Sequence, residues 1–163
     1  MSKIINLGNK KEAIEILEKC KSKIYDEEFK IINIYLNSIV DKNNKKIFEK
    51  ADLYVLGSTL FTCMQSFTKE TKGHNPHNLT SEEVYYSLKT IKDTNKFEVV
   101  EIKRYKIVTL CISISGHPVI VIIDKDAALK ANKKARVNKL VTIYPNRHEK
   151  IIENQKKIID LSK

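Results

Sequence analysis

The sequence predicts an α+β protein in which N-terminal helices precede a small antiparallel β-sheet of four or five strands, packed on helices, with a further helix at the C-terminus. Apolar residues recur at helical spacing within residues 10–24 and 26–40. From residue 97 onward the chain instead carries β-branched runs joined by short polar or Gly-containing turns. Between these regions, Thr80-Ser81-Glu82-Glu83 forms a capping-box sequence, which predicts the start of a helix.

The N-terminal region is expected to hold two amphipathic helices. The first covers residues 10–24, and the second runs from a cap at Asp26 to Val40. Their apolar stripes are Ile14, Leu17, Cys20 and Ile24 in the first, and Phe29, Ile32, Leu36 and Val40 in the second. The polar run 41–46 is a candidate linker, the alternative being a loop within one domain. We therefore expect a helical segment over residues 1–46, which completes the fold or binds a regulator, and a second domain over residues 47–163.

The second domain is expected to contain the sheet. A short strand over 53–57 is followed by a helix over roughly 59–67, which Ser58 is placed to cap. Three β-rich runs, 97–103, 106–115 and 118–123, then predict an antiparallel meander. A final strand at about 137–144 ends at Pro145, and a terminal helix is indicated by Ile151, Ile152, Ile158 and Leu161.

Composition restricts the class of partner. A net charge of +10 on 163 residues favours polyanions, with nucleic acid the commonest and an anionic membrane surface or acidic protein the alternatives. Cys20, Cys63 and Cys111 form neither a disulfide framework nor a CxxC metal site, which fits a reducing compartment. No segment has the pattern of a signal peptide, and the apolar runs are far shorter than the ~20 residues that span a bilayer. We expect a soluble, cytoplasmic protein without a membrane partner, unless a route without a classical signal peptide delivers it into another cell.

Three motifs carry a family resemblance. They are His77-Asn78-Leu79-Thr80, Gly116-His117-Pro118-Val119-Ile120-Val121 and Asn138-Lys139-Leu140-Val141-Thr142-Ile143-Tyr144. The predicted elements from about residue 53 onward follow the order strand, helix, histidine-bearing helix entry, meander, basic loop and final strand. Over roughly the last two-thirds of the chain, this order resembles the phage-associated branch of the barnase, EndoU, colicin and RelE-like (BECR-fold) ribonuclease superfamily, whose members are often toxin domains of phage and mobile elements.

The resemblance implies RNA cleavage without a metal or other cofactor. A base removes the 2′-hydroxyl proton, the oxygen attacks the adjacent phosphorus, and an acid protonates the leaving oxygen. His77 would carry the proton, Arg104 would stabilise the phosphorane, and Thr142 and Tyr144 would bind phosphate or orient the base. Lys103 and Lys106 are the other candidates for the inward-facing cation. His74 and His77 are spaced like part of a metal site, but no further ligand is obviously placed to complete it.

The substrate-binding surface is expected to be basic. Its candidate residues are the cations of the meander, the loop before the last strand and the residues after that strand: Lys103, Lys106, Lys133, Lys134, Arg136, Lys139, Arg147 and His148. Each assignment has a structural alternative. The basic loop can simply be solvated, His77 can be a polar cap, Thr142 and Tyr144 can be ordinary strand residues, and His117 is assigned to a turn.

The functional hypothesis is therefore an endoribonuclease of toxin type, a hydrolase that binds RNA. Such an enzyme needs an inhibitor, so we expect an acidic antitoxin or immunity protein as its partner. The alternatives are a nucleic-acid-binding module of the same fold without catalysis, and an interaction protein whose lysines serve only solubility.

Overall fold

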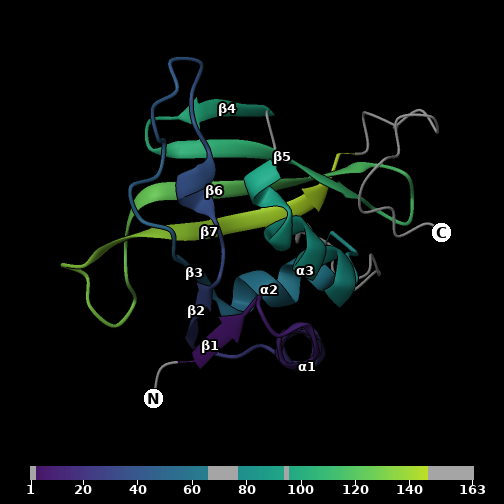
Figure 1. Ribbon diagram of the computed structural model, residues 1–163. Helices are drawn as coiled ribbons and strands as arrows, with labels where there is room; N and C mark the ends of the chain where they lie inside the picture. The colour runs from purple at the N-terminus through teal and green to yellow at the C-terminus, as the bar shows by residue number, and fades with distance from the viewer. Residues whose placement is uncertain (1–2, 66–76, 94–95, 147–163) are drawn as a thin grey trace.

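The computed structural model describes residues 3–65, 77–93 and 96–146. Within these ranges it contains a seven-stranded mixed sheet with three α-helices and two short 3₁₀ turns (Figure 1). The strands are β1 (Lys3–Asn6), β2 (Glu28–Ile32), β3 (Leu53–Leu56), β4 (Lys96–Glu101), β5 (Arg104–Ile112), β6 (Pro118–Ala128) and β7 (Arg136–Pro145). The helices are α1 (Lys10–Ser22), α2 (Gly57–Met64) and α3 (Ser81–Lys89), and the 3₁₀ turns are η1 (Leu36–Ser38) and η3 (Ile91–Asp93).

The sheet is larger than the sequence predicts, and it is mixed. Its order is β1-β2-β3-β7-β6-β5-β4, with β1 parallel to β2 and β3 parallel to β7. The expected antiparallel meander is present as β4 to β6, and the expected final strand, β7, pairs antiparallel with β6. The prediction of a small antiparallel sheet is nevertheless wrong, because β1, β2 and β3 extend the meander beyond β7 (Figure 1).

Of the two expected N-terminal helices, α1 is present, but the second is wrong. The region assigned to it contains β2 and η1 instead. In β2, Phe29 and Ile31 are buried while the residues between and beside them are only partly covered, which is the alternation of a strand. Pairing with β1 on one side and β3 on the other outweighs the helical spacing of the apolar residues. β1 was not predicted.

The polar run 41–46 forms the turn of a small hairpin. Val40 and Lys46 make an isolated antiparallel bridge, and the Asp41 carboxylate accepts hydrogen bonds from the backbone N–H groups of Asn43 and Lys45. A domain boundary at residue 46 stays a prediction, although β1 and β2 lie in the same sheet as the later strands. The expected C-terminal helix lies outside the described residues.

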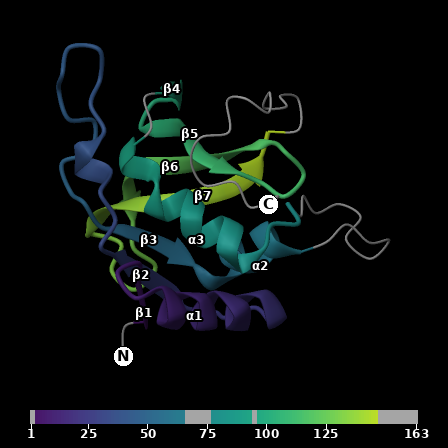
Figure 2. The ribbon, with the colours of Figure 1, turned by 45° about the vertical axis from the view of Figure 1, so that its right-hand side comes forward.

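The helices pack together against the sheet (Figure 2). The side chain of Asn9 caps α1 by accepting a hydrogen bond from the Glu12 N–H at 3.2 Å. Ala13, Leu17 and Cys20 form the buried side of α1, as the sequence pattern indicates for the last two. None of the described helices is long and apolar enough to cross a membrane.

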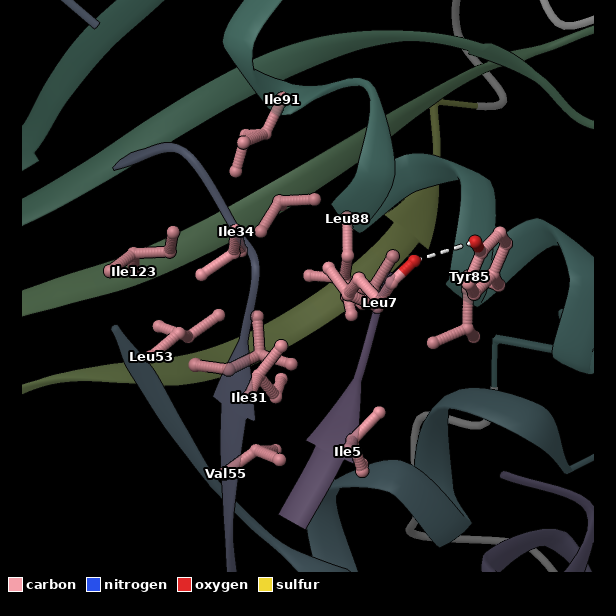
Figure 3. Packing of buried hydrophobic residues seen from close by; sticks show 14 of the residues in the cluster. Ile5, Leu7, Ile31, Ile34, Leu53, Val55, Tyr85, Leu88, Ile91 and Ile123 are labelled. Carbon is pink, nitrogen blue, oxygen red and sulfur yellow. Dashed lines mark hydrogen bonds between the residues drawn. The ribbon is translucent and has the colours of Figure 1, made fainter. Parts of the chain in front are cut away.

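One continuous core joins the N-terminal strands to the meander (Figure 3). Ile31, Leu53 and Ile123 are fully buried within it, so the added strands and the meander share one apolar interior. The Tyr85 hydroxyl of α3 donates a hydrogen bond of 2.8 Å to the carbonyl oxygen of Leu7, directly after β1 (Figure 3). This contact satisfies a buried polar group and links the two halves of the chain.

Gly57 lets β3 turn directly into α2. A Cβ atom at this position would lie 2.4 Å from the carbonyl oxygen of Tyr25, so no other residue fits without a backbone shift. The Gly57 N–H donates to the Glu27 carbonyl at 2.9 Å. The predicted strand and helix are present here, but the helix begins at Gly57 without a side-chain cap and ends at Met64. β3 therefore stops at Leu56, whereas β7 continues past it.

Candidate active site

The last part of β7 borders a helix where a neighbouring strand would otherwise lie. β3 pairs with β7 only at Asn138 and Lys139, and α2 packs beside the remainder. The Ile143 N–H donates to the Cys63 sulfur of α2 at 3.4 Å, and the Thr142 Oγ1 lies 3.9 Å from the same sulfur. Cys63 therefore holds the end of β7 against α2.

His77 reaches this place from the segment that leads into α3. Its backbone N–H donates to the Thr62 carbonyl at 3.3 Å, and the Leu79 N–H donates to the Cys63 carbonyl at 3.0 Å. Asn78, between them, has a φ of 55°, a conformation that asparagine tolerates better than most residues. The imidazole of His77 lies against the ring of Tyr144, with 5.7 Å between ring centroids and 44° between ring planes. We call His77, Thr142, Tyr144 and Cys63 the β7 corner.

Register places Thr142 and Tyr144 on one face of the sheet. They are opposite Ile122 and Ile120 of β6, and residues two apart on a strand share a face. Three of the four predicted catalytic residues, His77, Thr142 and Tyr144, therefore lie in the β7 corner, although His77 and Thr142 are 65 positions apart in the sequence.

The helix entry beside His77 is fixed by the predicted capping box, which is confirmed. The Glu83 N–H donates to the Thr80 hydroxyl at 3.0 Å, and the Thr80 N–H donates to Glu83 Oε1 at 2.9 Å. Glu83 is buried, and its Oε2 also accepts from the Ile114 N–H at 3.1 Å. One carboxylate thus ties the start of α3 to the turn between β5 and β6.

The same turn carries His117, to which the sequence analysis gave no catalytic role. The Ser113 N–H donates to the His117 carbonyl at 2.8 Å, closing the turn. His117 lies three residues before Ile120, the cross-strand partner of Tyr144, so it belongs to the same end of the sheet. The only sequence signal for it was its place in the Gly116-His117-Pro118 motif.

Arg104 lies elsewhere. It pairs with Asp124 of β6, four residues along from Ile120, which corresponds to about 13 Å at the rise of a β-strand. Its Nε is 3.0 Å from Asp124 Oδ1, and its Nη1 is 3.7 Å from Glu101 Oε2. The hydrogen bond to Asp124, together with its charge, raises the pKa of Arg104. The structure does not bring this guanidinium to the β7 corner.

Lys106 is the better placed of the three candidate cations. It is opposite Ile122, which is opposite Thr142, so the three residues form one row across the sheet and share a face. Its ammonium lies 3.1 Å from Glu98 Oε2, an exposed carboxylate. Lys103 instead lies in the turn before β5 with a φ of 72°, 2.9 Å from Asp126.

Four of the six predicted substrate-binding cations that the structure describes have acidic neighbours. Lys139 lies 2.6 Å from Glu28 of β2, an ion pair rather than a well-directed hydrogen bond, and both side chains are largely buried. Arg136 Nε is 3.9 Å from Asp126. Lys133 and Lys134 are exposed in the loop before β7. His74, Arg147 and His148 lie outside the described residues.

In the β7 corner, Cys63 is uncharged near pH 7, unlike the members of these ion pairs. Burial raises the pKa of Cys63 to about 11, and the hydrogen bonds from Ile143 and Thr142 oppose this only in part. The sulfur is therefore a neutral thiol near pH 7. The sulfur accepts from the Ile143 N–H, and either Cys63 or Thr142 can be the donor in the contact between the sulfur and Thr142 Oγ1.

Among the described residues, no group of three His, Cys, Asp or Glu side chains is arranged to hold a metal ion. Comparisons of the chain with protein-family models, with curated proteins and with solved structures give no match. The resemblance to the ribonuclease superfamily therefore stays a prediction from the three motifs.

Proposed function

We propose that this protein is an endoribonuclease of toxin type that cleaves RNA by attack of the 2′-hydroxyl on the adjacent phosphate. The observation that carries this proposal is the contact of the His77 imidazole with Tyr144, which shares a strand face with Thr142. A histidine is the side chain best suited to move protons near neutral pH, and two hydroxyls on one strand face suit phosphate oxygens.

The roles follow from the geometry of the β7 corner. His77 takes or returns a proton at the reacting oxygens, and the Tyr144 ring limits the orientations of the imidazole. The contact between the Cys63 sulfur and Thr142 Oγ1 allows either atom to be the donor; when the thiol donates, the hydroxyl proton of Thr142 is available to a phosphate oxygen. The reaction needs both a base and an acid, and His117, at the same end of the sheet, is the candidate for the second proton carrier.

Lys106 replaces Arg104 as the candidate for stabilising the phosphorane. It shares a row and a face with Thr142. Its partner Glu98 is 68% exposed on its side chain, and ion pairs in solvent are worth little, so the ammonium can turn to a phosphate. Arg104 is held by two carboxylates and lies farther away.

The test is incubation of the full chain with total RNA, with and without EDTA, followed by chemical mapping of the cut ends. We expect cleavage in both conditions and 2′,3′-cyclic phosphate ends. His77→Ala should lower the cleavage rate by about 10²- to 10⁴-fold, the usual contribution of acid–base catalysis. Lys106→Ala should lower it more than Arg104→Ala.

Tyr54→Phe is the matched control for Tyr144→Phe, since Tyr54 lies on the neighbouring strand β3 with its ring near Lys30 and away from the β7 corner. Cleavage that survives His77→Ala, or that responds equally to the two tyrosine variants, would contradict the proposed site.

A nucleic-acid-binding module without catalysis is the second candidate. It is favoured by the absence of Arg104 from the β7 corner, since the predicted constellation then has one cation fewer near its proton carrier. Salt-dependent RNA binding by the wild type, with no cut ends at any enzyme concentration, would identify this alternative.

A further inference from the structure

β4 lies at one edge of the sheet, and in the described part of the chain it pairs with β5 alone (Figure 1). A strand in this position presents a row of backbone N–H and C=O groups to the outside, where another extended chain can pair. Natural edges are usually blunted by charges or bulges. β4 has a bulge between Val99 and Glu101, and Lys96, Glu98 and Glu101 are charged, but the stretch next to the bulge, Val99 and Val100, is apolar and exposed.

Three apolar side chains are exposed within four positions of this edge. Val99 is 63% exposed, Val100 50% and Ile102 90%. Single exposed apolar residues are common on protein surfaces, but a contiguous group marks a contact surface. The end of β4 and the turn after it therefore offer an apolar anchor beside a strand edge.

A basic pocket adjoins this anchor. Ile102 lines a cavity of about 430 Å³ whose wall also holds four cations and two carboxylates: Lys50, Lys103, Lys125, Arg136, Glu49 and Asp126. Asp126 is shared by two of the cations, at 2.9 Å from Lys103 Nζ and 3.9 Å from Arg136 Nε. The pocket consequently keeps an excess of positive charge.

The two carboxylates of β4 itself lie next to cations of β5. Glu98 lies 3.1 Å from Lys106, and Glu101 lies 3.7 Å from Arg104. Each carboxylate therefore has a cation of β5 beside it, and the excess of positive charge near this edge comes from the pocket.

We propose that β4 is a docking strand for an acidic, extended polypeptide segment of another protein. The segment adds to the edge of β4 through backbone hydrogen bonds, covers Val99 and Ile102 with its apolar side chains, and directs its carboxylates to the basic pocket. Complementary charge selects the partner and speeds its association, and the apolar anchor holds it.

A protein partner fits this surface better than RNA. Single-stranded RNA is bound largely by stacking of bases on aromatic rings. The ring that the pocket could offer, Tyr105, is packed edge-on against Phe48 at 5.5 Å between centroids, and the exposed groups are aliphatic. Aliphatic side chains beside a strand edge are typical of recognition by strand addition.

This surface is separate from the β7 corner. The pocket includes Arg136 at the start of β7, and Tyr144 lies eight residues later, about 26 Å along the strand. A segment docked on β4 leaves His77 and Tyr144 open. The inference therefore does not rest on the proposed function, and either can fail without the other.

The test measures binding of a fluorescent peptide of about ten residues that alternates valine and glutamate to the full chain, by fluorescence anisotropy at low salt. We expect saturable binding of this peptide and none of its valine–lysine counterpart. Ile102→Glu should weaken binding about tenfold, the effect of losing an interface anchor. Ile24→Glu is the matched control, because Ile24 is 59% exposed and lies far along the chain, between α1 and β2.

Backbone amide exchange distinguishes strand addition from loose ionic contact. The amides of Val99 and Val100 should exchange more slowly when the acidic peptide is bound. The proposal is overturned by absence of binding, by equal loss in the two isoleucine variants, or by unchanged exchange in β4. It is also overturned if an RNA oligonucleotide protects these amides instead, or if sedimentation shows that Ile102→Glu dissociates a dimer of this chain.

Discussion

The two ends of the sheet use polar groups in different ways. The β7 corner brings together the thiol of Cys63, the side chains of Thr142 and Tyr144 and the imidazole of His77. The thiol and the two hydroxyls are uncharged near neutral pH. At the opposite end, Lys103, Arg104 and Arg136 are each matched to carboxylates. The high net charge therefore does not mark the candidate site, because many of the cations are occupied by the fold itself.

The largest expected difference between the ends concerns Cys63. Its thiol is held neutral by burial, with a pKa raised from 9.0 to about 11, so at pH 8 its thiolate fraction is about a hundredfold lower than that of an ordinary cysteine. Because the pKa of Cys63 is higher in the folded protein than in the unfolded one, the protonated thiol favours the folded state. This contribution to the free energy of unfolding is present below the unfolded pKa and is lost as pH rises through about 11.

We expect a disulfide reagent at pH 8 to modify Cys63 only as fast as the protein opens. Ser58→Cys, on the exposed side of the same helix, should react at once and serves as the control. Rapid modification of Cys63 in the native protein would show that the β7 corner is not closed by α2.

Glu83→Ala tests how firmly the β7 corner is tied to the rest of the fold. The change removes half of a capping box and leaves the Ile114 N–H without its acceptor, so we expect a loss of about 3 kcal/mol in unfolding free energy. Urea denaturation measures it. Glu82→Ala, an exposed change in the same helical turn, should cost about 0.5 kcal/mol through the helix dipole alone. Equal losses of unfolding free energy in Glu83→Ala and Glu82→Ala would mean that the hydrogen bond from the Ile114 N–H to Glu83 contributes nothing to stability.

Lys139→Ala examines the largely buried ion pair nearer the charged end. Glu28 would keep the N–H of Lys130 as a donor but lose its cation, and we expect a loss of about 2 kcal/mol. The double variant Glu28→Gln/Lys139→Ala should recover part of the loss, since no uncompensated charge then remains. A double variant less stable than Lys139→Ala would contradict this account.

Asp126→Asn should give the smallest effect. The hydrogen bond from Lys103 lowers the pKa of Asp126 below its ordinary 3.8, but the carboxylate is exposed, so near pH 7 we expect no resolvable change in thermal midpoint. The contribution is present above the unfolded pKa and is lost as pH falls through the lower folded pKa. The two proteins should therefore have the same thermal midpoint in acid as well. A large difference in thermal midpoint between the two proteins at pH 7 would show that the ion pairs of Asp126 stabilise the fold more than exposed ion pairs usually do.

The sequence was sufficient where the signal is local. α1, the capping box at Thr80 and the meander depend on neighbouring residues, and all three are present. The prediction of a helix over residues 26–40 is wrong because β2 is stabilised by pairing with β1 and β3, which are distant in sequence. The spacing of its isoleucines is compatible with both the helical and the strand period.

The candidate site shows the same limit. His77, Thr142 and Tyr144 were selected from motifs, and the structure brings them together. Arg104 and Lys106 could not be distinguished, because the answer depends on the register of β5 against β6 and on which carboxylates lie nearby. Nothing in the sequence placed Cys63 at the site, because its hydrogen bond from the Ile143 N–H depends on α2 packing beside β7.

The central place of β7 also affects how the chain folds. β7 is the last described strand in sequence, yet it lies between β3 and β6 and is the link by which β1, β2 and β3 join the meander. During synthesis, the first three strands therefore emerge long before the strand that connects them to the rest of the sheet. Contacts of such long sequence separation slow folding, so the open edge of β3 is exposed until β7 arrives. A nascent chain that ends before residue 136 should be the form of this protein most prone to associate with other chains.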